Sequence, residues 1–392
     1  MGLGKTVTSL AIMTHYRHEW PLLILCPASL RHTWPCEIEK FLPSLPASAI
    51  YVVSGFDDAD FLENPTKKKQ IQIVVATYSL LQTRSAAAKV LEQFKFQCVI
   101  CDESHNLKQK TSQRTKLALP LLQTAKRLAL LSGTPALARP VELWTQIYSL
   151  APQLFGTYPQ FTKEYCNARR GRFGWDVNGL SNADELHKKL KQVMVRRLKS
   201  DVLKELPPKQ RSMVPIPIAK GKRKECQELM QELKDTRQSV AELAGDEASS
   251  ADFDARRLLM QAYQASGVAK APGICDYLIE WLQGSGNQKV LVFGHHKALL
   301  DALEVAVSKE LKGSGHIRID GQVPPNERAA RVRKFQTCPR VRVAILSMTA
   351  AGVGLTLTAA TTVMFGELHW TPGVLAQGAW LRGTNNVYVF GY

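Results

Sequence analysis

Two stretches of the chain alternate short apolar runs with helical patterns, and this alternation constrains the fold more than any other feature. The first stretch has apolar runs at Leu22–Cys26, Ile50–Val53, Ile71–Ala76, Cys98–Cys101 and Leu128–Leu131. The second stretch has runs at Lys289–Phe293, His316–Ile319, Val341–Leu346 and Val363–Phe365. Strands separated by helices are typical of βαβ units. The sequence therefore predicts an α/β fold with two parallel sheets.

The segment between these stretches lacks that rhythm and is expected to be mainly helical. Long polar patterns run over Glu185–Leu206 and Lys220–Leu243, and the acidic Gly245–Asp254 is expected to be a flexible loop. We therefore expect three parts: a first lobe over 1–150, a helical insertion and linker over 151–286, and a second lobe over 287–392. Asn385–Phe390 has the composition of a short strand that can complete the second sheet.

The charge balance favours a polyanionic partner. The chain has 51 Lys and Arg against 34 Asp and Glu, a formal net charge of +17. Nucleic acid is the leading candidate because phosphate neutralisation releases counterions. A solvated basic surface is the simpler alternative.

The cysteines and apolar segments indicate the compartment. Eight cysteines are too few for a disulfide scaffold and form no paired CxxC motifs, as expected in a reducing compartment. Cys98 and Cys101 belong to one apolar run and should point to opposite faces of a strand. No apolar stretch approaches the roughly 20 residues that cross a bilayer. We therefore expect a soluble intracellular protein.

The chain opens with a motif that suits phosphate binding. Gly2, Gly4, Lys5 and Thr6 form Gly-x-Gly-Lys-Thr and lead into a helical pattern over Val7–Tyr16. Glycines let the backbone wrap a phosphate, the lysine reaches the outer phosphate oxygens, and the threonine hydroxyl ligates Mg²⁺. So short a motif also arises by chance. A strand normally precedes such a loop, and we expect that strand to lie outside this chain.

An acidic pair follows the fourth apolar run. Asp102 and Glu103 end the run at Cys98–Cys101, about 96 residues after Thr6. A Mg²⁺-dependent nucleotidase needs an aspartate that holds the metal through its water shell and a glutamate that polarises the attacking water. An acidic pair on the surface is the alternative, which the order of the two motifs disfavours.

Small hydroxylated residues follow two further runs. Ser132 and Thr134 come after Leu128–Leu131, and Ser347, Thr349, Gly352 and Gly354 come after Val341–Leu346. Backbone N–H groups and hydroxyls in such loops can bind phosphates of DNA or ATP. A plain turn and a glycine-rich connection are the alternatives.

Taken together, these motifs resemble the Swi/Snf group of superfamily-two helicase-like ATPases over nearly the whole chain. The matching segments are Gly-Leu-Gly-Lys-Thr, Asp-Glu-Ser-His, Leu-Ser-Gly-Thr-Pro, Ala-Ala-Gly-Val-Gly-Leu-Thr and His-Trp-Thr-Pro-Gly at 369–373. Within the group, the chain is most similar to the annealing helicases of the zinc-finger RAN-binding-domain and A-like Swi/Snf-related types. The resemblance implies two RecA-like lobes with parallel sheets, joined by a mainly helical Swi/Snf-type insertion.

The resemblance also implies roles for individual residues. Gly2, Gly4, Lys5 and Thr6 would bind ATP, Thr6 and Asp102 would hold Mg²⁺, and Lys5, Asp102 and Glu103 would be catalytic. The residues implied in coupling or DNA contact are His105, Ser132, Thr134, Arg196, Arg197, Lys199, Ser347, Thr349, Gly352 and Gly354. A solvated helix face is the alternative for the basic trio at 196–199.

The implied activity is ATP-driven movement on double-stranded or forked DNA, in the nucleus, by an annealing helicase or replication-fork remodeller. DNA would be bound through its phosphates, and replication or repair proteins would be recruited by regions absent from this chain. A nucleosome remodeller is an alternative with the same fold. A catalytically impaired DNA-binding fragment of such a motor is an alternative of another class.

The chain departs from the family pattern after Gln377. Relatives carry arginines there, whereas this chain reads Gly378-Ala379-Trp380-Leu381-Arg382-Gly383. An arginine finger is worth about 10³–10⁵ in turnover. The sequence therefore predicts that this chain hydrolyses ATP poorly.

Overall fold

The computed structural model describes most of the 392 residues. Described are residues 3–53, 55, 69–82, 85–133, 139–171, 174–197, 202, 210–218, 220–242, 245–312, 315–348, 357–369 and 386–391. The chain divides into two compact units, unit 1 over Met1–Glu205 and unit 2 over most of Leu206–Tyr392. The boundaries expected at residues 150 and 286 stay predictions.

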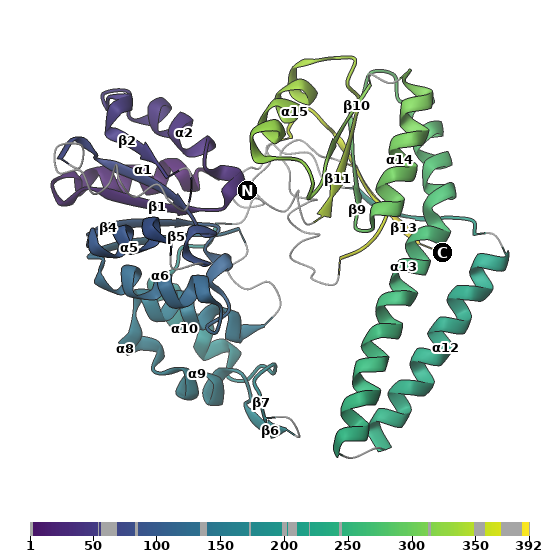
Figure 1. Cartoon of the computed structure of the whole chain (residues 1–392), viewed down its shortest axis with the longest axis horizontal. Coiled ribbons are helices and arrows are strands. Elements are labelled where there is room, and N and C mark those ends of the chain that lie inside the picture. The colour runs from purple at the N-terminus through teal and green to yellow at the C-terminus, as the bar shows by residue number, and fades with distance from the viewer. Residues whose placement is uncertain are drawn as a thin grey trace. The chain divides into compact units, whose positions relative to one another are not determined.

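Unit 1 is built on a five-stranded parallel sheet (Figure 1). Its strands are β1 (Leu22–Cys26), β2 (Ile50–Val52), β3 (Ile73–Thr77), β4 (Cys98–Asp102) and β5 (Arg127–Leu131), in the order β2-β3-β1-β4-β5. Every residue of β1, β3 and β4 is buried, as expected for central parallel strands covered on both faces.

Helices cover both faces of this sheet. They are α1 (Lys5–His15), α2 (Thr33–Phe41), α5 (Ala86–Gln93) and α6 (Gln113–Thr124). Alternate strand residues pack with α1 and α2 on one face and with α5 and α6 on the other. Cys98 belongs to the first layer and Cys101 to the second, so the prediction that they point to opposite faces is confirmed.

The rest of unit 1 is a helical subdomain that carries a short β-ribbon. Its helices are α7 (Trp144–Leu150), α8 (Pro152–Phe155), α9 (Tyr158–Tyr165) and α10 (Ala183–Val193), and the ribbon strands are β6 (Arg169–Gly171) and β7 (Gly174–Asp176). Phe161 and Tyr165 are the largest fully buried side chains of its core. Short 3-10 turns in unit 1 are η1 (Arg17–Glu19), η2 (Ala28–Leu30), η3 (Ala47–Ala49), η4 (Leu80–Gln82), η5 (Ser104–Leu107) and η6 (Pro140–Leu143).

Unit 2 repeats the strand order of unit 1. Its strands are β8 (Gln210–Pro215), β9 (Val290–Gly294), β10 (His316–Ile319), β11 (Val343–Ser347), β12 (Thr362–Phe365) and β13 (Asn386–Gly391), in the order β10-β11-β9-β12-β13-β8. Counted from β9, the first five follow the same 2-3-1-4-5 order as β1 to β5, and all pairs are parallel. Two lobes of this kind are RecA-like, so the predicted fold class is confirmed.

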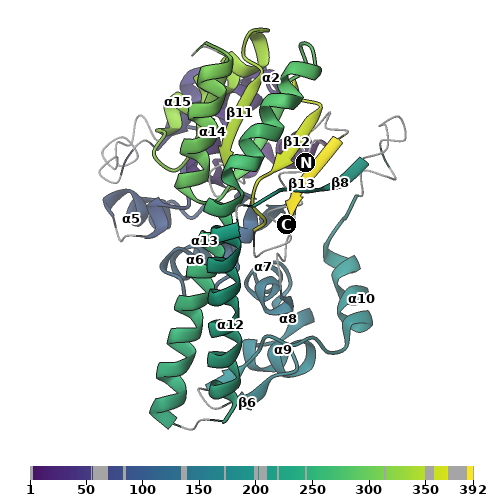
Figure 2. The ribbon, with the colours of Figure 1, turned by 90° about the vertical axis from the view of Figure 1, so that its right-hand side faces the viewer.

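The helices of unit 2 are α12 (Lys220–Glu242), α13 (Gly245–Gly284), α14 (Lys297–Glu310) and α15 (Pro325–Thr337). The C-terminal part of α13 packs with α14 on one face of the sheet, and α15 packs on the other through Phe335. The N-terminal part of α13 and all of α12 form a hairpin that extends away from the sheet (Figure 2). Leu233 of α12 packs between Ala255 and Leu258 of α13 in this hairpin.

The structure corrects two expectations for residues 151–286. The loop expected over Gly245–Asp254 is wrong, because these residues begin α13. The strands β6, β7 and β8 were not foreseen. All but two of their residues are exposed, so they lack the apolar runs that mark the other strands.

All eight cysteines are free thiols. Among the described residues, no helix combines the length and the apolar character that a membrane-spanning segment requires.

Candidate nucleotide site

The N-terminus of α1 has the geometry of a phosphate-binding turn. Gly4 is the N-cap residue and has a left-handed backbone with φ of 76°, which side chains rarely adopt. No side chain caps the free N–H groups of the first turn. Lys5 and Thr6 are half-buried in this turn. The N-terminus of a helix attracts anions through these N–H groups. Gly2, the first glycine of the motif, lies outside the described residues.

Asp102 is held at the end of β4 by three neighbours. Its side chain is 9% exposed. The Trp34 indole Nε1 donates to Oδ2 at 3.1 Å, and the backbone N–H of Glu103 donates to Oδ1 at 2.9 Å. The Tyr78 hydroxyl donates to the backbone carbonyl of Asp102 at 2.9 Å. The carboxylate therefore has a fixed position at the end of the strand.

The surroundings of Asp102 oppose its ionisation. Burial, together with the neighbouring charge of Glu103, raises the pKa of Asp102 to about 6. The hydrogen bonds from Glu103 and Trp34 and the positive charge of Lys5 act in the other direction. Asp102 is therefore mainly ionised at neutral pH. Lys5 is therefore close enough to Asp102 for its positive charge to favour the ionised carboxylate.

Glu103 presents an acceptor that the described residues do not saturate. The residue is 5% exposed and has a left-handed backbone with φ of 49°. Its Oε2 lies 3.2 Å from His105 Nδ1, yet it is buried without a hydrogen bond from any described residue. The distance satisfies an ion pair but the angle does not complete a hydrogen bond. A buried acceptor of this kind can orient a water molecule or a substrate group.

His105 connects the acidic pair to the end of β5. Its Nδ1 is also 3.2 Å from the Ser132 hydroxyl, which follows β5 directly. Ser104 donates to Gln146 of α7 at 2.8 Å, so the same segment is tied to the helical subdomain. The ends of two adjacent strands are thus linked beside the acidic pair.

The remaining predicted residues lie elsewhere in the chain. Arg196 and Arg197 are exposed and follow the end of α10, so the alternative that placed them on a helix face is wrong. Ser347 is the last residue of β11 in unit 2 and is buried. Outside the described residues lie Gly2, Thr134, Lys199, Thr349, Gly352, Gly354 and the departing segment at 378–383.

Sequence reasoning missed three residues at the strand ends. Trp34 and Tyr78 hold Asp102 in unit 1. In unit 2, Glu367 is 1% exposed and lies just beyond β12. Its Oε2 accepts the backbone N–H groups of His295 and His296 at 2.6 and 2.9 Å, and its Oε1 is 2.5 Å from His296 Nδ1. In the sequence, the one signal for Glu367 was its position shortly after an apolar run.

The residues present fit a magnesium-bound nucleotide. Mg²⁺ usually retains waters and binds one or two carboxylates together with substrate phosphates. Thr6 and Asp102 supply one hydroxyl and one carboxylate on that pattern. Within the described ranges, no three His, Cys, Asp or Glu side chains gather as a metal site built from protein alone would require.

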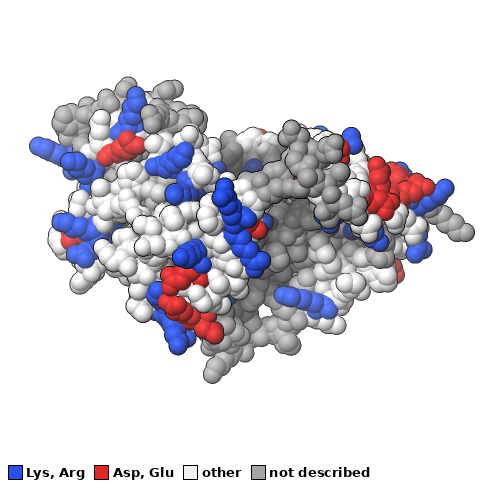
Figure 3. Space-filling view, turned by 90° about the horizontal axis from the view of Figure 1, so that it is seen from below, with Lys and Arg blue, Asp and Glu red and all other residues white. Residues whose placement is uncertain are grey.

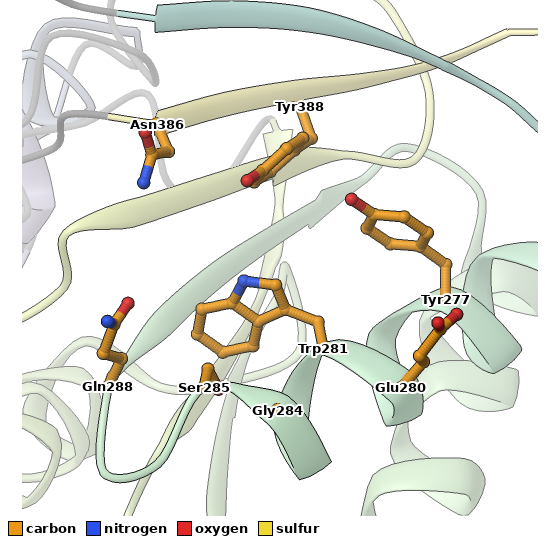
Figure 4. Close-up of a pocket in the computed structure, with 8 residues that line it drawn as sticks. All are labelled: Tyr277, Glu280, Trp281, Gly284, Ser285, Gln288, Asn386 and Tyr388. Carbon is orange, nitrogen blue, oxygen red and sulfur yellow. The ribbon is translucent and has the colours of Figure 1, made fainter.

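Unit 2 contains a separate open cavity of about 410 Å³ (Figure 4). It lies between the C-terminal part of α13 and β13, with Trp281, Tyr277 and Tyr388 as its aromatic walls. None of the predicted site residues lines it. This cavity is therefore distinct from the nucleotide site of unit 1.

The fold and the site together define a helicase-like ATPase, with two parallel-sheet lobes, a Gly-Lys-Thr turn and an Asp-Glu pair at a strand end. Comparison with family models agrees with this class. The SNF2-related domain matches residues 1–267, and the helicase conserved C-terminal domain matches residues 273–379. The chain therefore belongs to the SNF2-related family.

Curated relatives match along nearly the whole chain. The DNA annealing helicase and endonuclease ZRANB3 of Bos taurus is 42% identical over 382 residues, which are 96% of this chain and 34% of that protein. The SWI/SNF-related matrix-associated actin-dependent regulator of chromatin subfamily A-like protein 1 homolog of Caenorhabditis elegans is 38% identical, over 96% of this chain and 52% of that protein. The chain spans about a third to a half of the length of these relatives.

A solved structure, the Sulfolobus solfataricus SWI2/SNF2 ATPase core in complex with dsDNA, covers 100% of this chain and 82% of that chain at 21% identity and a TM-score of 0.43.

Proposed function

We propose that this chain is the ATP-driven motor of a protein that moves on double-stranded DNA, of the annealing-helicase or fork-remodelling kind. The observation that carries the proposal is the site in unit 1, where the charge of Lys5 favours the ionised form of Asp102 and the buried Oε2 of Glu103 accepts no hydrogen bond from a described residue. The curated relatives named above support the DNA substrate. A magnesium ion, when bound, would neutralise charge on the transferring phosphate.

The described residues then have separate roles in hydrolysis. Lys5 binds the outer phosphates, and the α1 N–H groups beginning at Gly4 bind phosphate oxygens. Thr6 and Asp102 would hold the magnesium ion. Glu103 orients the attacking water through Oε2, the acceptor that no described residue saturates.

Other residues are proposed to couple the nucleotide state to DNA. His105 and Ser132 join the ends of β4 and β5, so a change at Glu103 can reach the segment after β5, which includes Thr134. Arg196 and Arg197 are exposed cations suited to backbone phosphates, together with Lys199. Ser347 and the following Thr349, Gly352 and Gly354 are proposed to contact DNA from unit 2.

Charge supports a nucleic-acid partner. On the face shown in Figure 3, basic side chains are spread widely and acidic ones gather in few places. With a net charge of +17, binding should be independent of sequence and weaken steeply with salt. We propose that the protein acts in the nucleus, because the relatives act on DNA and chromatin by name.

The test compares Lys5→Ala with Lys89→Ala, an exposed lysine of α5 on the other side of the sheet from α1. Phosphate release is measured with and without duplex DNA, and movement is measured by displacement of a third strand from a triplex. We expect slow, DNA-stimulated release that Lys5→Ala abolishes and Lys89→Ala retains. Slow turnover is expected because the family's arginine segment is replaced after Gln377.

Measurements of duplex affinity, nucleosome sliding and fork regression, made beside the hydrolysis assay, distinguish the alternatives. A pure DNA binder would bind duplex with equal affinity in both variants and release no phosphate above background. A nucleosome remodeller would slide nucleosomes and fail to regress a model fork. Either outcome contradicts the proposal.

A further inference from the structure

The ribbon of β6 and β7 presents an exposed tryptophan beside arginines. The two strands pair antiparallel, with Arg169 opposite Asp176 and Arg170 opposite Trp175. All six residues of the two strands are exposed. Trp175 is 70% exposed and is the only exposed tryptophan among those that the structure describes. The ribbon projects at the edge of the helical subdomain (Figure 1).

The register separates the charges of the ribbon onto its two faces. Directly opposed residues of an antiparallel pair point to the same face, and successive residues alternate. Arg170 and Trp175 therefore share one face, and Arg169 and Asp176 share the other. The only carboxylate of the two strands thus lies away from Trp175. No ion pair involving Arg169 or Arg170 is present in the described part of the chain.

The base of the ribbon is fixed, although a two-stranded ribbon alone is marginally stable in water. Ser181 accepts the backbone N–H of Asn167 at 3.1 Å and donates to the carbonyl of Glu164 at 2.7 Å. A Cβ on Gly179 would lie 2.9 Å from both the carbonyl oxygen of Cys166 and the Cβ of Asn167, so the two ends of the ribbon are in close contact. The fold therefore holds Trp175 outward on an anchored support.

An exposed aromatic ring beside an unpaired guanidinium suits unpaired nucleotides. A tryptophan gains most of its contact energy when it is buried, and this fold leaves Trp175 in water. Base stacking on aromatic side chains and arginine contacts to the backbone are the means by which proteins hold single strands. The base faces inside a duplex are covered by their neighbours, so a ring can stack only where pairing ends.

We propose that the β6–β7 ribbon binds an unpaired nucleotide next to duplex DNA, with Trp175 stacking on the base and Arg170 contacting an adjoining phosphate. This inference rests on the proposed function, because it names the kind of DNA that the motor engages: a junction between duplex and single strand.

The test measures DNA affinity of the whole chain by fluorescence anisotropy without nucleotide. Three ligands are compared: a blunt duplex, the same duplex with a short single-stranded extension, and a duplex whose extension has abasic sites. The abasic extension keeps the phosphates and removes the bases. We expect the extension to tighten binding roughly tenfold, as one stacked base allows, and the abasic form to lose most of that gain.

Single substitutions distinguish the contribution of base stacking to DNA binding from that of arginine charge. Trp175→Ala should bind all three ligands with similar affinity, and Trp175→Tyr should keep most of the preference for the extension. Arg170→Ala should weaken binding to the extension, whereas Arg169→Ala, which removes an equal charge from the other face, should have the smaller effect. Trp175 is exposed, so these variants should keep their melting temperatures.

Two results would overturn the proposal: a chain that binds blunt and extended DNA equally, or a Trp175→Ala variant that keeps the preference. In the second case the ribbon is a protein-binding surface, where exposed Trp and Arg are also common. Binding to blunt duplex and phosphate release test the proposed function independently of the ribbon. A Trp175-dependent preference supports the ribbon site even where duplex stimulates no hydrolysis.

Discussion

Replacing Asp102 with Asn should change how the stability of unit 1 depends on pH. Burial raises the pKa of Asp102 from its ordinary 3.8 to about 6 in the folded chain. At about 1.4 kcal/mol per pH unit, this rise corresponds to about 3 kcal/mol. Asn carries no charge, so the variant lacks this contribution at every pH.

The direction follows from which state binds the proton more tightly. Below pH 3.8, Asp102 is protonated in the folded and unfolded chains and contributes no difference in free energy. As the pH rises towards 6, the unfolded chain ionises first, and the folded state loses stability relative to it. Above that range the loss is complete. The unfolding free energy of the wild type, minus that of Asp102→Asn, should therefore fall by about 2.4 kcal/mol between pH 4 and pH 7, because part of the full change of about 3 kcal/mol occurs below pH 4.

The loss of a hydrogen bond in Asp102→Asn does not change how the difference in unfolding free energy depends on pH. Asn has one acceptor oxygen, so either the Trp34 indole or the Glu103 N–H loses its partner. That cost is about 1–3 kcal/mol and is nearly the same at every pH. It shifts the difference in unfolding free energy between the two proteins by the same amount at every pH.

Urea unfolding of the nucleotide-free proteins, followed by circular dichroism from pH 4 to pH 7.5, measures the difference. The unfolding transition whose midpoint the substitution shifts is assigned to unit 1. If the difference in unfolding free energy is constant with pH, or rises with pH, the site does not oppose ionisation of Asp102.

Three further predictions concern other contacts. Trp34→Phe removes one hydrogen bond to the site aspartate and should weaken magnesium-dependent nucleotide binding by about 0.5–1.5 kcal/mol in a fluorescent-nucleotide titration; unchanged affinity would contradict it. Gly267→Ala would place a Cβ 2.1 Å from Oε1 of Glu367 and should cost about 1–3 kcal/mol in thermal unfolding, whereas Gly284→Ala, in open space on the same helix, should cost far less. Arg318→Ala leaves three carboxylates without their shared partner and should destabilise unit 2 by about 3 kcal/mol; a melting temperature equal to wild type would contradict this.

The sequence predicts the central strands well for a physical reason. Parallel strands covered on both faces are continuous apolar runs, and Leu22–Cys26 was predicted with its observed bounds. The last strand was also foreseen, as β13 over Asn386–Gly391. β8 was missed because it is an edge strand that, in the described sheet, pairs with β13 alone and exposes Gln210, Arg211, Met213 and Pro215. Its existence depends on a partner that is distant in the chain.

The candidate site was predictable only as far as its motifs. Lys5, Asp102 and Glu103 carry a recognisable pattern of residue types. Trp34 and Tyr78 do not, because they reach Asp102 across 68 and 24 residues of sequence. Their contact depends on the order β3-β1-β4, which places the ends of these strands side by side. No local pattern encodes that order.

The repeated strand order gives two acidic residues corresponding positions. Asp102 ends β4, the fourth strand of its sheet, and Glu367 follows β12, the fourth in the other. Glu367 receives two backbone N–H groups and contacts an imidazole, so its oxygens are occupied by the chain itself. Glu103, beside Asp102, has a buried Oε2 that accepts no hydrogen bond from a described residue, although His105 Nδ1 lies 3.2 Å from it. The same strand order therefore places an acid that ties two loops together in unit 2, and in unit 1 an acidic pair in which one glutamate oxygen accepts no hydrogen bond from a described residue.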